Sequence, residues 1–261
     1  MRILLIGDVV GRPGRRAIRE LLPPLVEELR ADFVVVNGEN AAGGFGITEP
    51  TYRELLDAGA HVVTTGNHVW DRKEVLAFID HAPQLVRPAN FPPGAPGRGS
   101  VVVRSPGGVP VAVLNLMGRT FMSALDCPFR TADRLVEELR RETPVVVVDF
   151  HAEATAEKVA MGWFLDGRAT VVFGTHTHVP TADERVLPRG TAYLTDLGMT
   201  GPRDGVIGME REGVLRHLLS GLPHRFEVAS GVARMDAALV QLDEASGRAS
   251  SIQRIHRFTA S

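Results

Sequence analysis

The sequence has little cysteine, no long apolar run and no cluster of positive charge. Its single cysteine, Cys127, excludes an intramolecular disulfide and suits a reducing compartment. The chain reaches Gly7 and Asp8 too early for the apolar core of a signal peptide, and no apolar run approaches the length that spans a membrane. We therefore expect a cytoplasmic protein without a membrane partner.

Charge and size narrow the class of protein further. The 29 basic and 31 acidic residues leave a formal net charge of −2. Without a cluster of lysine or arginine residues the chain has no surface to bind a long phosphate backbone, so we expect no long nucleic acid as partner. The hydrophobic fraction of 44% is typical of a globular protein, and 261 residues fit around one core. We predict a single domain over residues 1–261.

Several short apolar runs each stop at a polar side chain that could bind a ligand. The central run covers residues 62–65 and ends at Gly66, Asn67 and His68. Four further runs end in the same way, at Asp8, at Glu39 and Asn40, at His151, and at His176 and His178. If the runs are parallel strands of one sheet, their carboxyl ends lie along one edge, where α/β proteins bind ligands. The sequence therefore predicts one cluster of these side chains.

Helical patterns separate the runs and predict an α/β fold. They cover residues 15–30, 48–59, 71–81, 132–141 and 155–165. We expect Pro23 and Pro24 to kink or split the first helix. From residue 83 to 110 the strict alternation is lost, which makes two packed sheets plausible, and residues 225–228, 237–242 and 252–258 are typical of antiparallel strands. The segment 88–99 and the C-terminal strands could serve assembly into a homo-oligomer.

The histidines favour a metal site. Five of the nine are expected on the surface, namely His61, His81, His217, His224 and His256. One histidine after a strand is usually a structural residue, but four together with two acids and two amides favour metal binding. Nitrogen and oxygen ligands without thiolate suit iron, manganese or zinc. About seven ligands suit two ions that share a carboxylate and hold a hydroxide for in-line attack on phosphorus, so phosphoester hydrolysis is the predicted reaction.

Three residues near the predicted site allow two interpretations each. Phe45, in the glycine-rich segment 41–47, could cover a ligand or stack on a base, or it could belong to a plain connector. Arg119 could hold a phosphate, although a solvated surface arginine is the preferred interpretation. Asp71 could orient His68, although an acid stabilised at the start of a helix is preferred.

The ordered motifs resemble those of the calcineurin-like metallophosphoesterases, which have a two-sheet α/β/β/α sandwich. These motifs are Gly7-Asp8, Gly66-Asn67-His68, the lone His151 and Gly174-Thr175-His176-Thr177-His178. The sequence departs from the general family at Val10, where the family has histidine, and at Glu39, where it has aspartate. Both departures, with Gly38-Glu39-Asn40, Arg87-Pro88-Ala89-Asn90 and residues 196–201, resemble the bacterial YmdB-like branch over nearly the whole chain.

The resemblance implies roles for individual residues. It places Asp8, Asn40 and His178 on one ion, Asn67, His151 and His176 on the other, and Glu39 between them as a bridge. It implies that His68 is not a ligand but a catalytic residue near the phosphate, where it stabilises charge or protonates the leaving oxygen. An imidazole suits that transfer because it titrates near neutrality.

The resulting hypothesis is a two-metal phosphodiesterase that acts on small phosphodiesters. Members of the YmdB-like branch act on cyclic nucleotides and often carry iron, so 2′,3′-cyclic nucleotides are the expected substrates and iron the expected metal, with manganese or zinc as alternatives. Two other functions stay open: a dinuclear hydrolase of phosphomonoesters or amides, and a regulatory protein that senses nucleotides with little turnover.

Overall fold

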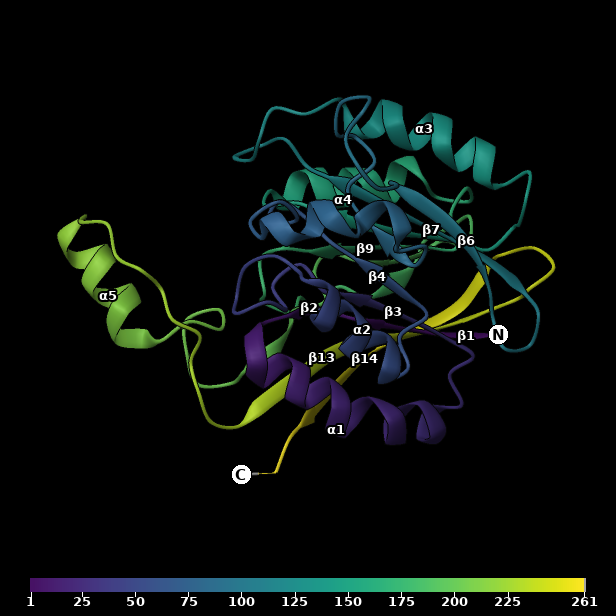
Figure 1. Cartoon of the computed structure of the whole chain (residues 1–261). Coiled ribbons are helices and arrows are strands. Elements are labelled where there is room, and N and C mark those ends of the chain that lie inside the picture. Colours follow the sequence, from purple (N-terminus) through teal and green to yellow (C-terminus); the bar gives the residue numbers. More distant parts are fainter. Residues whose placement is uncertain (261) are drawn as a thin grey trace.

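Two β-sheets packed face to face, with helices on both outer surfaces, form the body of the protein (Figure 1). The computed structural model describes residues 1–260. The first sheet has the strand order β2-β12-β13-β1-β3-β4-β5, with β14 paired to β13. Its strands are β1 (Arg2–Ile6), β2 (Asp8–Val9), β3 (Phe33–Asn37), β4 (Val62–Thr64), β5 (Leu85–Val86), β12 (Met199–Pro202), β13 (Ala233–Leu242) and β14 (Ala249–Phe258).

The second sheet has the order β10-β11-β9-β8-β7-β6. Its strands are β6 (Ser100–Arg104), β7 (Pro110–Met117), β8 (Val146–His151), β9 (Val171–Thr175), β10 (Arg185–Val186) and β11 (Ala192–Leu194). In each sheet four neighbouring strands are parallel: β1, β3, β4 and β5 in the first, and β7, β8, β9 and β11 in the second. The predicted two-sheet α/β architecture is confirmed, but the simpler assumption of one sheet is wrong.

Three apolar layers explain why the strands read as continuous hydrophobic runs. Along β1, Ile3 and Leu5 pack between the two sheets, whereas Leu4 and Ile6 pack against the helices of the first sheet. A third layer lies between the second sheet and its helices and includes Phe150. Strands buried on both faces need no polar alternation.

The helices are α1 (Gly11–Leu29), α2 (Glu49–Asp57), α3 (Pro128–Leu139), α4 (Thr155–Phe164) and α5 (Arg211–Ser220), with short 3₁₀ helices at Lys73–Ala77 and Ile79–His81. The first helix is not split, because α1 runs through Pro23 and Pro24, and a kink at these prolines stays a prediction. Both prolines are exposed, as are Arg19 and Glu20, whose carbonyl groups lose their intrahelical partners. Water can satisfy these groups there, while Leu22 and Leu25 pack into the core.

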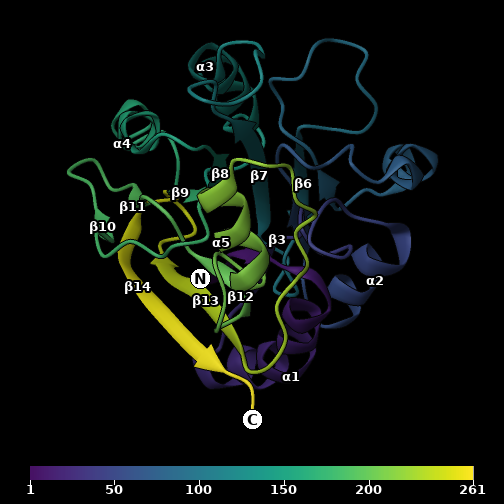
Figure 2. The same ribbon diagram turned by 90° about the vertical axis from the view of Figure 1, so that its left-hand side faces the viewer.

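Other departures lie in three segments. The helix expected over residues 71–81 is reduced to the two 3₁₀ turns, and residues 225–228 are not a regular strand. No sequence pattern indicated α5, which buries none of its residues and projects away from the body (Figure 1). When that side is turned toward the viewer, α5 is seen in front of the sheets (Figure 2). No helix within residues 1–260 is both long and apolar enough to cross a membrane. The single domain stays a prediction.

Candidate metal centre

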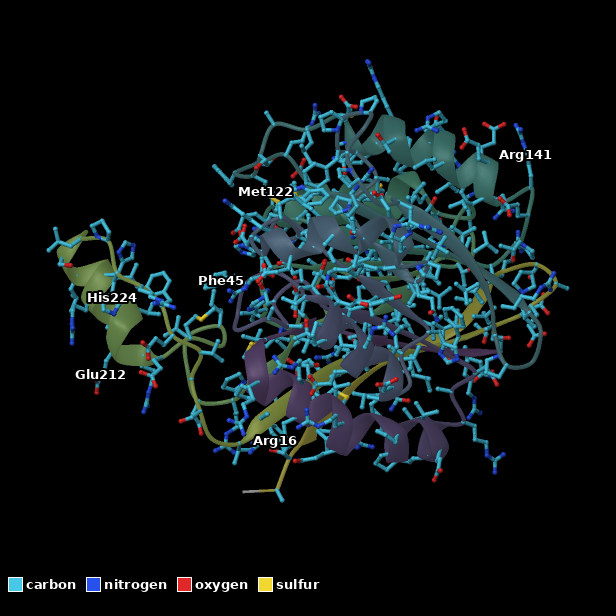
Figure 3. All side chains as sticks on the ribbon, in the orientation of Figure 1. Arg16, Phe45, Met122, Arg141, Glu212 and His224 are labelled. Atoms are coloured by element: carbon cyan, nitrogen blue, oxygen red, sulfur yellow. The ribbon has the colours of Figure 1, made fainter. Side chains whose placement is uncertain are left out.

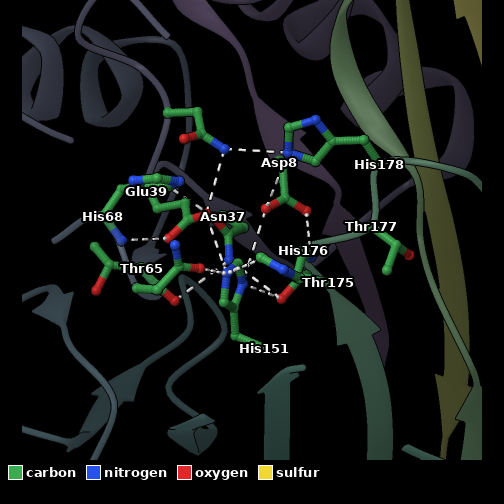
Figure 4. A network of polar contacts seen from close by, with 12 residues as sticks. Asp8, Asn37, Glu39, Thr65, His68, His151, Thr175, His176, Thr177 and His178 are labelled. Carbon is green, nitrogen blue, oxygen red and sulfur yellow. Dashed lines mark hydrogen bonds and ion pairs between the residues drawn. The ribbon is translucent and has the colours of Figure 1, made fainter. Parts of the chain in front are cut away.

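The polar residues that follow the strands meet where both sheets end (Figure 4). The first sheet supplies Asp8 at the start of β2, Glu39 and Asn40 after β3, and Asn67 and His68 after β4. The second supplies His151 at the end of β8 and His176 and His178 after β9. The structure therefore brings together all the residues proposed as ligands. They lie between two sheet ends, not along one edge.

His151 is the centre of this cluster. Its Nε2 lies 3.0 Å from Glu39 Oε1, 2.9 Å from Asn67 Oδ1 and 3.1 Å from His176 Nδ1. Its Nδ1 lies 2.9 Å from the Thr175 hydroxyl, which donates its own hydrogen to Asp149 Oδ1. The proton of a neutral His151 therefore sits on Nδ1, and its Nε2 presents a lone pair to the other three atoms.

A second group of ligand atoms surrounds Asp8. The Nδ1 of His178 donates to the carbonyl oxygen of Ile207 at 2.9 Å, so its Nε2 is the free nitrogen. That Nε2 lies 3.1 Å from the Asn40 amide and 3.8 Å from Asp8 Oδ1. Asp8 Oδ1 and Asn40 Oδ1 are buried and have no hydrogen-bond partner within the described residues. An unpartnered, buried Asp8 oxygen beside the free His178 nitrogen fits the binding of a cation.

The pKa values of the buried groups reflect how closely the titratable side chains of the cluster pack together. Burial alone would lower the pKa of His151, but the adjacent Glu39 carboxylate outweighs it and raises that pKa to about 9. Burial would raise the pKa of Glu39, yet His151 lowers it to about 2. Burial raises the pKa of Asp8 to about 6, and burial followed by His151 lowers the pKa of His176 to about 3. Within the protein alone, a proton at His151 takes the place of a cation.

The residues present fit a transition-metal ion. Glu39, His151 and His176 offer ligand atoms that all lie within 4.8 Å of one another. Gly66 leaves room beside them, since a Cβ there would overlap Glu39 Oε2 and the His151 ring. The donors are nitrogen and oxygen without sulfur, as iron, manganese and zinc accept. The number and kind of ions stay a prediction.

The loop that carries two of these histidines has an unusual backbone. His176 and His178 have positive φ angles of 95° and 62°, which let both rings reach the cluster from just beyond β9. Between them, Thr177 donates its N–H and its hydroxyl to Asp196 Oδ2, at 3.3 and 2.6 Å. The buried Lys158 ammonium lies 2.6 Å from the same oxygen. This ion pair fixes the loop, and Lys158 was not among the predicted residues, although a lone lysine on the buried face of a helix was a signal.

A buried carboxylate also joins the two sheets beneath the cluster. Asp149 on β8 accepts hydrogen bonds from Asn37 on β3 (3.0 Å), Thr64 on β4 (2.5 Å) and Thr175 on β9 (2.7 Å). Burial raises the pKa of this carboxyl above its usual value, although His151 and the three donors oppose the rise. Asp149 was missed because it lies inside an apolar run.

A cavity of about 290 Å³ opens beside the cluster and has two chemically different sides. We call the first the polar floor; it consists of Glu39, Asn40, His68, Glu153, His176, Thr177 and His178. We call the second the apolar wall; it consists of Gly44, Phe45, Ile207, Met209 and Phe226. Glu153, absent from the predicted residues, lies 3.1 Å from His176 Nε2 and so leaves His176 Nδ1 facing the cluster.

The structure also bears on the three ambiguous residues. Asp71 Oδ2 lies 2.8 Å from His68 Nδ1, so the contact with His68 is present. Asp71 lies two residues before the short helix that begins at Lys73, and its preferred role at a helix start stays a prediction. Phe45 lines the cavity with its ring edge-on to His68, 5.1 Å away. Arg119 is exposed and lines a different hollow.

Fold and motif together define the class of protein: a two-sheet metallophosphoesterase. The family model described as "YmdB-like protein" matches residues 4–255, and the chain belongs to this family. The chain is 52% identical over 255 residues to the 2′,3′-cyclic-nucleotide 2′-phosphodiesterase of Bacillus subtilis, covering 98% of this chain and 96% of that protein.

Two solved structures have nearly the same fold. A hypothetical protein from Thermus thermophilus superposes with a TM-score of 0.93 at 46% identity, with all of both chains covered. A phosphatase from Mycoplasma pneumoniae superposes with the same TM-score at 35% identity, covering 99% of this chain and 93% of that chain. The architecture is therefore that of the family throughout.

Proposed function

We propose that this chain is a metal-dependent phosphodiesterase that hydrolyses small phosphodiesters, with 2′,3′-cyclic nucleotides as substrates. One observation carries the proposal: Glu39 Oε1, Asn67 Oδ1 and His176 Nδ1 all lie within 3.1 Å of His151 Nε2. Oxygen and nitrogen ligand atoms this close together in a buried site fit a bound metal ion. The name of the B. subtilis relative, 52% identical, supports the reaction and the substrate class.

The donor set fits two transition-metal ions, iron being the preferred one. Asn67, His151 and His176 would hold the first ion, Asp8, Asn40 and His178 the second, and Glu39 would lie between them. When bound, such ions supply an activated water molecule and neutralise charge on a phosphate.

His68 is the proposed catalytic residue that is not a ligand. Its Nδ1 is bound to the Asp71 carboxylate, so Nε2 is the atom free to carry a proton into the cavity. Its backbone N–H donates to Glu39 Oε2 at 3.2 Å, which ties the position of His68 to the carboxylate that would hold both ions. A proton on Nε2 would pass to the 2′ or 3′ oxygen as the phosphorus bond breaks.

The test combines metal content with turnover. Wild type, Glu39→Gln, His68→Ala and the exposed control His81→Ala are purified under reducing conditions without chelator. We expect close to two ions per wild-type chain and turnover of 2′,3′-cyclic AMP and bis-p-nitrophenyl phosphate. Glu39→Gln should lose metal, whereas His68→Ala should keep metal and lose about 10²- to 10⁴-fold in kcat. A wild type without stoichiometric metal would overturn the two-metal mechanism.

The phosphomonoesterase alternative is tested in the same assay, because a second relative, from M. pneumoniae, is named a putative phosphatase/phosphodiesterase. Faster turnover of p-nitrophenyl phosphate than of the diesters would favour it. Nucleotide binding by the metal-loaded protein without turnover would instead favour a sensing role.

A further inference from the structure

The apolar wall is one continuous surface, although it comes from two segments far apart in the sequence. Phe45 belongs to the loop after β3, whereas Ile207, Met209 and Phe226 belong to the segment around α5. The two segments touch at Gly44: a Cβ there would lie 2.7 Å from Val228 Cγ2 and 3.3 Å from Met209 Cε. Only a glycine allows the two segments to approach this closely, so the continuity of the wall depends on Gly44.

Phe45 is held firmly on its side of the wall. The glycines at positions 43, 44 and 46 have positive φ angles of 72°, 98° and 75°. Within this turn the Arg72 guanidinium donates to the carbonyl oxygens of Ala42 and Phe45, both 3.1 Å from its Nε. The backbone of Phe45 is thus clamped, and its ring stands beside His68 at the mouth of the polar floor.

Phe226 is presented from the opposite side by the projecting segment. Its ring packs edge-on against His217 of α5, with centroids 5.5 Å apart. The same segment is tied to the polar floor by the hydrogen bond from His178 Nδ1 to Ile207 O. Figure 3 shows Phe45 at the edge of the body that faces this segment, on which His224 and Glu212 are labelled.

We propose that the apolar wall is the nucleobase subsite of the site described above, with Phe226 as its main stacking residue; this rests on the proposed function. In a 2′,3′-cyclic nucleotide the base is joined to the ribose carbon next to the one that bears the 2′ oxygen. When the phosphate lies on the polar floor, only the ribose separates the base from the floor. The base therefore lies beside the apolar wall. Aromatic rings bind every base through its π-face, which predicts affinity for nucleosides with little choice among bases.

The test compares a substrate with a base and one without. The kcat/KM of the metal-loaded enzyme is measured for 2′,3′-cyclic AMP and for methyl β-ribofuranoside 2′,3′-cyclic phosphate. Stacking is worth about 1–3 kcal/mol per base, so Phe226→Ala should lower kcat/KM for cyclic AMP roughly 5- to 150-fold. The abasic ester should change less than about twofold. Phe226→Tyr should retain activity, Phe226→Leu should not, and the exposed Phe258→Ala on β14 is the matched control.

Each result decides the question. Equal losses on both substrates, or full activity of Phe226→Leu, would show a merely structural or shielding wall and overturn the subsite. If the wild type hydrolyses neither ester, the proposed function fails, and calorimetric titration with 3′-AMP and ribose 3-phosphate then tests the subsite alone. A preference for 3′-AMP that disappears in Phe226→Ala supports it, and equal affinities overturn it.

Discussion

The polar floor and the apolar wall line one cavity, yet they are built in opposite ways. The floor residue Glu39 is fully buried, and its neighbours are fixed by the ends of β3, β4, β8 and β9. The wall residue Phe226 lies on a segment outside the sandwich, close to α5, which buries none of its residues. The fold therefore determines which side chains make up the polar floor. The apolar wall instead depends on a segment that the core does not need. Changes to the floor should alter metal and rate, and changes to the wall should alter KM.

Gly66→Ala should have the largest effect, because it acts on the floor without removing any ligand. The new Cβ would overlap Glu39 Oε2 and the His151 ring, so both must move. Since a misplacement of about 1 Å can cost on the order of 10²-fold in rate, we expect at least a 10²-fold loss of kcat together with loss of metal. Elemental analysis and turnover check this. Gly107→Ala, whose Cβ would meet Ser105 Oγ only at 3.8 Å, is the control, and full metal content in Gly66→Ala would contradict the prediction.

The same contrast explains how much the sequence could predict. Strand ends appear in the sequence as apolar runs that stop at polar residues. Asp8, Glu39, His151 and His176 can therefore be recognised from the order of residues alone. The runs do not say which sheet each strand joins, because buried strands of both sheets are equally apolar. Only the loss of strict alternation over residues 83–110 indicated a second sheet.

The supporting residues and the wall were missed for different physical reasons. Lys158 and Asp149 act through tertiary contacts, to Asp196 and to three donors on other strands, and such contacts have no sequence period. Phe226 lies in an irregular segment held by a few distant contacts, and α5 has no buried face to produce a helical pattern. Prediction thus succeeded where burial imposes a pattern and failed where it does not.

Lys158→Met should show that the floor depends on its buried support. It leaves the Asp196 carboxylate buried without its cation, and breaking such a pair by removing one partner typically costs about 3–5 kcal/mol. Urea denaturation should reveal this loss, and metal affinity should fall because Thr177 loses its anchor. Lys73→Met, at the other lysine and exposed, should change little. Adding Asp196→Asn should restore part of the stability; no recovery in the double variant would show that the charge is not the cause.

The pH dependence of the metal-free protein tests the crowding at the floor. The pKa of His151 is raised from 6.5 to about 9, so its contribution to stability is present below pH 6.5 and is lost as the pH rises through about 9. The shifted pKa values of Glu39, Asp8 and His176 all lie at about 6 or below, so most of the protons that these folded-state groups release above pH 6.5 come from His151. We expect a fall on the order of 1–3 kcal/mol between pH 6.5 and 9 in chelator. Saturating metal, or Glu39→Gln, should flatten the curve; a fall that survives both would place its origin elsewhere.

Ile207→Gly should give the smallest effect and the sharpest contrast between floor and wall. Ile207 has a φ of 46°, where a non-glycine residue is strained by roughly 1–2 kcal/mol and a β-branched one is rare. Glycine relieves that strain, less about 0.5–1 kcal/mol for the greater freedom of the unfolded chain. The free energy of unfolding should thus rise by up to about 1 kcal/mol in urea denaturation. The carbonyl group that holds His178 remains, so metal content should not change, while KM for 2′,3′-cyclic AMP should rise.

The control is Val206→Gly, next to Ile207 and without a positive φ, which should instead lose stability. Equal losses in the two variants would mean that the backbone at Ile207 is not strained. A gain in stability in Ile207→Gly alone would show that the backbone at Ile207 is strained and that this strain is kept for the shape of the cavity.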